Sequence, residues 1–192
     1  MEERSAHDQL YAVLPRLTLV GYRACGKSTA GRLVASRIGW PFVDADHVIE
    51  AMMGMPISAF FAAHGEPAFR DVEEKALASI LAVDHGIVLA TGGGAVLRAG
   101  NRTLLGARGG LVVYLQASAE ILQARLRHHA GERPSLTGVP VADEVPALLA
   151  IRDPLYRATA QHVVDATRGT ALVTSELHRL ICANRTTDTP HV

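Results

Sequence analysis

The stretch "GYRACGKST", residues 21–29, has the spacing of a loop that binds phosphate groups. It follows the apolar run 17–20 and leads into "AGRLVASRIG", where apolar residues recur at helical spacing. Gly21, Gly26, Lys27 and Ser28 fit the pattern Gly-x-x-x-x-Gly-Lys-Ser/Thr. In that pattern backbone N–H groups surround the phosphates, the lysine reaches the β- and γ-phosphates, and the hydroxyl contacts Mg²⁺. We therefore expect a strand, a phosphate-binding loop and a helix in that order, with a nucleoside triphosphate as ligand.

Composition narrows the possible partners. The chain has 192 residues, with 19 Lys plus Arg against 19 Asp plus Glu, so no bulk positive field favours nucleic acid or an anionic membrane. Its two cysteines, Cys25 and Cys182, have no metal-like spacing and suit a reducing cytoplasm. The first 16 residues lack the apolar segment of a signal peptide, and no window is apolar enough to span a membrane. We expect a cytoplasmic protein, with nothing that demands more than a monomer.

Short apolar runs alternate with helical patterns along the chain. The runs read as strands buried on both faces, which predicts an α/β fold: a three-layer sandwich with a five-stranded parallel sheet. We assign a single domain to residues 16–182, an N-terminal extension to 1–15 and a flexible C-terminal tail to 183–192. A helix start is expected near Pro154, because proline disturbs a helix interior. The predicted strands are 17–20, 41–43, 87–90, 111–115 and 162–164, and the predicted helices cover about 30–38, 69–83 and 118–127, with a fourth from about 143.

Two acids follow the second predicted strand, in "FVDADHVIE". Asp44 and Asp46 would face the crevice at the carboxyl edge of the sheet, where ligands of open α/β folds bind. One could serve the water shell of a metal ion and the other an acceptor hydroxyl. The alternative is that they cap the next helix.

Three further segments admit both a functional and a structural interpretation. Arg70, followed by Glu73 and Glu74, is either an exposed helical ion pair or a rigidly held grip for a substrate carboxylate. The run Gly92–Gly94 indicates either close approach by a ligand or a demanding turn. Arg152 and Arg157, in "RDPLYRA", would ordinarily be a surface pair. Residues 128–142 lose the helical period and are either a surface loop or a lid that carries a cation, Arg133.

Taken together and in this order, "GYRACGKSTAGRLVA", "DADHVIE", "GEPAFRDVE", "TGGGAV", "VVYL", "ERPSL" and "PLYR" resemble the shikimate kinase family, from about residue 17 to residue 180. The resemblance implies a P-loop kinase fold with a lid. It also implies transfer of the γ-phosphoryl group of ATP to the 3-hydroxyl of shikimate, in the route to chorismate and the aromatic amino acids, with ATP and Mg²⁺ as cofactors.

The resemblance also assigns roles to residues. Lys27, Asp46 and Arg133 are the implied catalytic groups, with Asp46 as base, and Ser28 with Asp44, acting through water, would hold the metal. Either Arg125 or Arg127 would stack on adenine. The implied substrate site contains Asp46, Arg70, Gly92, Gly93, Gly94 and Arg157, and the implied ATP site contains Gly21, Ala24, Cys25, Gly26, Lys27, Ser28, Thr29 and Arg133.

Three departures from the family pattern concern the nucleotide side, and one of them is the adenine-side segment "RLRHHAGE", which differs from the common pattern. The family commonly has Gly where Ala24 stands, so a positive φ there would cost about 1 kcal/mol or more. Ser135 replaces an apolar residue of the lid. Two other functions stay open: a kinase of similar build acting on gluconate, and a binding protein that has kept the fold and lost turnover.

Overall fold

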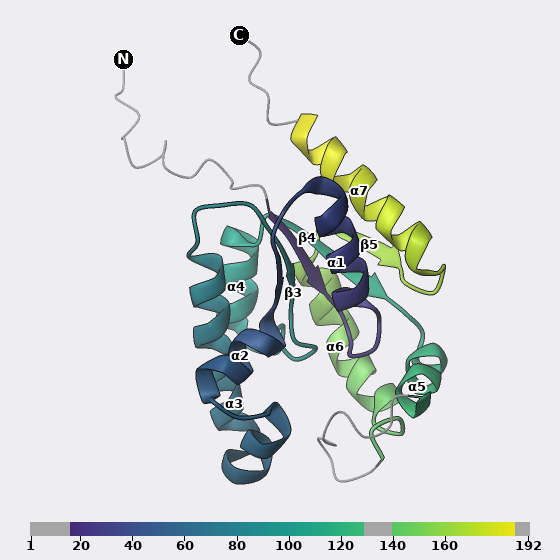
Figure 1. The fold of residues 1–192 in the computed structure, drawn as a ribbon. Helices are drawn as coiled ribbons and strands as arrows, with labels where there is room; N and C mark the ends of the chain where they lie inside the picture. Colours follow the sequence, from purple (N-terminus) through teal and green to yellow (C-terminus); the bar gives the residue numbers. More distant parts are fainter. Residues whose placement is uncertain (1–15, 129–139, 187–192) are drawn as a thin grey trace.

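The computed structural model describes residues 16–128 and 140–186. Within them, each strand is followed by one or two helices, from β1 to α7 (Figure 1). The elements are β1 Arg16–Val20, α1 Lys27–Ile38, β2 Phe42–Asp44, α2 Ala45–Met53, α3 Ile57–Leu81, β3 Ile87–Ala90, α4 Ala99–Arg108, β4 Leu111–Gln116, α5 Ala119–His128, α6 Val145–Thr159, β5 His162–Asp165 and α7 Thr170–Thr186.

The five strands form one parallel sheet in the order β2-β3-β1-β4-β5, which confirms the predicted fold class. Helices α1 and α7 pack together over one face, and α4 and α6 lie over the other (Figure 1). The three inner strands are almost wholly buried, as their continuous apolar runs predicted, whereas β5 is an edge strand with only Val164 buried.

The register brings the functional loops to one edge of the sheet. Leu19 of β1 pairs with Ala90 of β3, and Ala90 pairs with Asp44 at the end of β2. The residues that follow these strands are the phosphate loop, the two acids and the glycine run. All three therefore begin at the same carboxyl edge, where open α/β sheets bind ligands.

Several element boundaries differ from the sequence prediction. Pro154 lies inside α6, which begins at Val145 with Pro146 in its first turn, so the helix start expected near Pro154 is wrong. Helices α4 and α7 were not predicted. Helix α7 continues to Thr186, so residues 183–186, assigned to the tail, are helical.

Helix α3 is bent near its middle. Gly65 has φ 75° and ψ 175°, outside the helical region, and Pro67 follows two residues later. The helical pattern recognised in the sequence, from residue 69 onward, therefore belongs to the second part of α3. Within the described ranges, no single helix is long and apolar enough to cross a membrane; α2 and α3 pass that test only when taken together, across a bend of 86°.

Candidate active site

The phosphate loop connects β1 to α1 with glycine at its two most constrained positions. Gly21 has φ 144°, and a Cβ there would lie 2.7 Å from the carbonyl oxygen of Leu115 and 3.0 Å from the Cys25 sulfur. Gly26 has φ 103°, which L side chains rarely adopt. The chain thus turns from strand to helix in a conformation that only glycine accommodates at these points, as the loop pattern predicted.

Lys27 is buried and its ammonium group lies inside the loop. The Nζ atom donates hydrogen bonds to the carbonyl oxygens of Gly21, at 2.8 Å, and Tyr22, at 2.9 Å. These two carbonyls hold a full positive charge beside the helix N-terminus, which already favours anions. The arrangement suits the terminal phosphates of a nucleotide.

Ala24 has φ 62°, the one non-glycine residue with positive φ among the described residues. The question that the sequence left open therefore has an answer: this position is left-handed, and alanine there carries a conformational cost of about 1–2 kcal/mol.

The two acids after β2 have different surroundings. Asp44 caps α2: its Oδ1 accepts from the backbone N–H of Asp46 at 3.1 Å, and its Oδ2 accepts from the Ser28 hydroxyl at 2.6 Å. The capping alternative is thus correct for Asp44, and the same carboxylate also contacts the loop residue predicted to hold Mg²⁺. Oxygen atoms of this kind are the ligands that Mg²⁺ prefers.

Asp46 lies with Glu73 around Gly92. A Cβ on Gly92 would stand 3.0 Å from Asp46 Oδ1 and 2.7 Å from Glu73 Oε1, so a side chain there would displace one of the two carboxyl groups. Glu73 is 2% exposed, and its Oε1 has no hydrogen-bond partner within the described residues. Burial raises the pKa of Glu73, although the adjacent Arg70 opposes the shift. Glu73 was predicted only as a support for Arg70, and its position against the glycine run was missed.

Arg70 is held by two acids of its own helix. Its guanidinium donates to Glu73 at 2.6 Å and to Glu66 at 2.7 and 3.0 Å. It also lies against Gly94, where a Cβ would overlap it. The sequence predicted Glu73 and Glu74 as the supporting pair. Glu74 is wrong, because its carboxylate binds Arg98 instead, at 2.6 Å.

The structure separates the two arginines of α6. Arg157 pairs with Asp153 at 2.7 Å, and its side chain is 48% exposed, so its predicted place in the substrate site is wrong. Arg152 is 4% exposed; its guanidinium donates to the carbonyl of Gly93 at 3.4 Å and lies over the Tyr22 ring at 5.6 Å. Residues five apart on a helix differ by about 140° in direction, so both could not face one pocket.

Arg152 therefore belongs to the cluster around the glycine run. The Tyr156 hydroxyl also donates to the Gly93 carbonyl, which ties α6 to this turn. The Arg152 charge partly offsets the burial that raises the pKa of Glu73, as expected for groups that share one pocket. No signal within "RDPLYRA" itself distinguished the two arginines; the direction in which each faces depends on how α6 packs.

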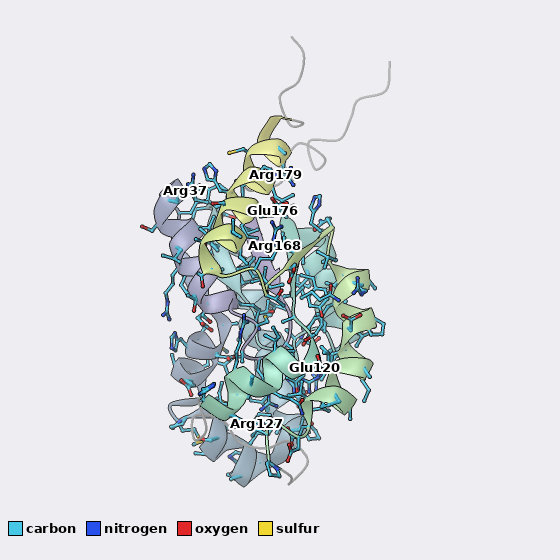
Figure 2. The ribbon with its side chains drawn as sticks, turned by 90° about the vertical axis from the view of Figure 1, so that its right-hand side faces the viewer. Arg37, Glu120, Arg127, Arg168, Glu176 and Arg179 are labelled. Carbon is cyan, nitrogen blue, oxygen red and sulfur yellow. The ribbon has the colours of Figure 1, made fainter. Side chains whose placement is uncertain are left out.

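A cleft of about 750 Å³ extends from Asp44 and Asp46 across the phosphate loop to the segment after β5. Arg125 crosses from α5 to donate to the carbonyls of Ala24, at 3.2 Å, and Ala166, at 2.9 Å. Arg127 also lines the cleft, but its side chain is 65% exposed at the surface of α5 and lies 3.7 Å from Asp143 (Figure 2). The segment after β5 was missed by the sequence interpretation; its residues that line the cleft are Ala166, Gly169, Thr170 and Val173.

The cleft has room for a base and ribose beyond the phosphate loop. Its far end is formed by small or apolar groups next to two arginines, and its near end by the lysine and carboxylates. Arg133 and Ser135, both in the predicted lid, lie outside the described residues.

A parallel sheet with the phosphate loop after its central strand, and a cluster of carboxylates and arginines beside that loop, define a P-loop kinase of small molecules. The family model described as shikimate kinase matches residues 23–181. The chain belongs to the shikimate kinase family, as the sequence resemblance predicted, and kinases of this family use ATP.

Individual relatives agree with this assignment. A shikimate kinase of Oleidesulfovibrio alaskensis is 45% identical over 172 residues, which cover 88% of this chain and 99% of the relative. A solved structure of shikimate kinase from Acinetobacter baumannii in complex with shikimate has a TM-score of 0.83 at 36% identity, covering 92% of this chain and 98% of that one. A gluconokinase from Sinorhizobium meliloti, with a TM-score of 0.62 at 21% identity over 91% of this chain and 97% of that one, shares the fold alone.

Proposed function

We propose that this protein transfers the γ-phosphoryl group of ATP to the 3-hydroxyl of shikimate, giving shikimate 3-phosphate and ADP on the route to chorismate. The observation that carries the proposal is the cluster of side chains around Gly92–Gly94. It places one carboxylate of α2, one arginine of α3 and one arginine of α6 beside a phosphate loop. A small anion with vicinal hydroxyls is the type of acceptor that such groups bind.

The two arginines divide the work of binding the acceptor carboxylate. Arg70 has a fixed orientation because Glu66 accepts from its Nε and one terminal nitrogen and Glu73 accepts from the other, while Arg152 contacts the Gly93 carbonyl of the same glycine run. A carboxylate between them would receive charge-assisted hydrogen bonds in a largely buried setting, where such bonds are strongest. The prediction that placed Arg157 in this role is thus replaced by Arg152.

Asp46 supplies the base in this proposal. Its carboxylate lies next to Gly92, and Asp46 lines the same cleft as Asp44 and the phosphate loop. The acceptor oxygen forms a bond to the γ-phosphorus while the bond to the β-phosphate oxygen breaks, and the hydroxyl proton passes to the Asp46 carboxylate. Lys27 neutralises charge on the phosphates, and phosphoryl transfer depends mainly on such positioning and charge stabilisation.

Mg²⁺ fits the same site. Ser28 and Asp44 present oxygen atoms 2.6 Å apart in the cleft, and they would hold the ion directly and through water respectively. When bound, Mg²⁺ supplies further neutralisation of the β- and γ-phosphates. The lid role of Arg133, a cytoplasmic location and a monomeric state stay predictions that accompany this proposal.

The test is a coupled assay of ADP release with Mg-ATP and shikimate, run against quinate and gluconate. We expect turnover that depends on shikimate, with Asp46→Asn losing most of kcat while still binding ATP. Turnover with gluconate instead would support the alternative kinase. Binding of both ligands with no ADP release would identify a protein that has lost catalysis.

A further inference from the structure

Arg98 joins the glycine run to α3 from outside the pocket. It stands between the turn Gly92–Gly94 and the first residue of α4, and its guanidinium reaches across to α3. One terminal nitrogen binds the Glu74 carboxylate at 2.6 Å, and the other binds Asp71 at 2.6 Å and the carbonyl of Pro67 at 3.4 Å. A single side chain therefore contacts three residues of the second part of α3.

The contacts of Arg98 lie next to those of the pocket. Asp71 and Glu74 each follow directly after a pocket residue, Arg70 and Glu73, so the same two turns of α3 bear both sets. Because successive helical residues differ by about 100°, one face of these turns meets the glycine run and an adjacent face meets Arg98. A shift of α3 that weakened the Arg98 contacts would also move Arg70.

The other end of this connection is equally well fixed. The N–H of Leu97 donates to Gly94 at 2.9 Å, and the N–H of Ala95 donates to Gly92 at 3.2 Å, so the chain from the glycine run to Arg98 is tightly turned. Side chains of α4 then hold the carbonyls of this turn: Asn101 binds that of Ala95 at 3.0 Å, while Arg102 binds those of the next two residues.

Gly100 completes the contact between the two elements. A Cβ at that position would lie 2.8 Å from the Glu74 Oε1 atom, so glycine lets the Glu74 carboxylate approach the start of α4. The need for an external connection follows from the bend in α3. Gly65 interrupts α3 just before the turns that carry Arg70 and Glu74. The part of α3 before Gly65 therefore does not hold these turns in place through continuous helical hydrogen bonds.

We propose that Arg98 is a positioning residue for the acceptor pocket: it sets the distance between Arg70 on α3 and the glycine run, and so the affinity for the acceptor carboxylate. This inference rests on the proposed function. Arg98 itself does not touch the acceptor; it acts through Asp71 and Glu74. Exposed ion pairs contribute little to global stability, so this role is separable from folding.

The test is Arg98→Ala, with KM for shikimate, KM for ATP, kcat and Tm measured on the same preparation. We expect KM for shikimate to rise roughly fivefold to twentyfold, as small displacements of binding groups have large effects. KM for ATP should stay within about twofold, since the nucleotide cleft does not include α3. Glu74→Gln weakens the ion pair between Arg98 and Glu74, so it should also raise KM for shikimate. Arg98→Lys should give a KM for shikimate between those of wild type and Arg98→Ala.

The matched control is Arg179→Ala. Arg179 pairs with Glu176 through two contacts of 2.6 and 3.0 Å, at the exposed surface of α7 (Figure 2). It should leave both KM values unchanged. Unaltered KM for shikimate in folded Arg98→Ala, or equal rises in both KM values with a lowered Tm, would overturn the inference.

Two further results complete the design. If Arg98→Ala does not fold, Glu74→Gln decides the matter by the same criterion. Absence of shikimate-dependent turnover in the wild type would instead refute the proposed function and, with it, the role of Arg98, so the two failures are distinguishable.

Discussion

Replacing Ala24 by glycine should stabilise the protein. Ala24 has φ 62°, and a left-handed conformation costs an L-residue about 1–2 kcal/mol. Glycine removes that cost, while the greater freedom that it gives the unfolded chain offsets about 0.4–1 kcal/mol. The net gain is about 0.5–1 kcal/mol. At roughly 2–4 °C per kcal/mol for a chain of this size, Tm should rise by about 1–4 °C.

Thermal unfolding of the ligand-free protein, followed by calorimetry at neutral pH, measures this change. Gly39 provides the matched control: it ends α1 with φ 70°, and an added Cβ would meet nothing within 4 Å. Gly39→Ala imposes the conformational cost without a steric clash, so its Tm should fall by a similar amount. If Gly39→Ala lowers Tm and Ala24→Gly does not raise it, the reasoning about the loop conformation is refuted.

Three other changes test the site and its surroundings. Arg152→Ala should raise KM for shikimate roughly 10- to 100-fold, the value of one or two hydrogen bonds to a charged group, whereas Arg157→Ala should change it less than about twofold. Steady-state kinetics of the two variants measure this, and a larger effect of Arg157→Ala would contradict the assignment. Gly94→Ala should also weaken shikimate binding, measured by titration calorimetry, because the methyl group would displace the Arg70 guanidinium; an unchanged affinity would place the ligand elsewhere. Burial alone would raise the pKa of Asp153, but its hydrogen bonds, chiefly from Arg157, outweigh burial and hold that pKa below its usual value. The ionised Asp153 carboxylate therefore stabilises the fold above the ordinary pKa of the carboxyl, and this stabilisation is lost as pH falls. The difference in Tm between wild type and Asp153→Asn should be larger at pH 7 than at about pH 3. A difference that widens in acid would contradict this reasoning.

The fold was largely predictable because its strongest determinants are local. Strands buried on both faces must be continuously apolar, and that signal located all five strands to within a residue or so. Helix α4 was missed because "AGNRTLLGAR" has two glycines and buries only Asn101 and Leu105, which leaves little apolar periodicity. The interior position of Pro154 could not be inferred from local propensity, since packing of α6 against the sheet overrides it.

The site was predictable to the extent that its residues follow strands directly. Asp46 and Gly92 each lie two residues after the end of a strand, and Lys27 follows β1 across the phosphate loop, so the strand order brings all three to one edge of the sheet. Arg152 and Glu74 were misassigned for one reason. Helical spacing gives the angle between two side chains around the helix axis, but it does not say which side of the helix faces the glycine run. Arg98 gave no sequence signal as a partner of α3, since its partners lie 24 and 27 residues away.

The strand order separates the two proposed ligand sites along the chain as well as in space. The proposed acceptor groups Asp46, Arg70 and Gly92–Gly94 come from one continuous stretch that begins at β2 and ends before α4, on one side of the central strand. The end of the cleft that we propose for the nucleotide base comes from α5 and the segment after β5, on the other side. A recombinant exchange of residues 42–98 between relatives would thus transfer the acceptor pocket as one block, together with Arg98. Arg152 would not be transferred with this block, because it lies on α6. A hybrid kinase would therefore keep the recipient's own residue at the position of Arg152.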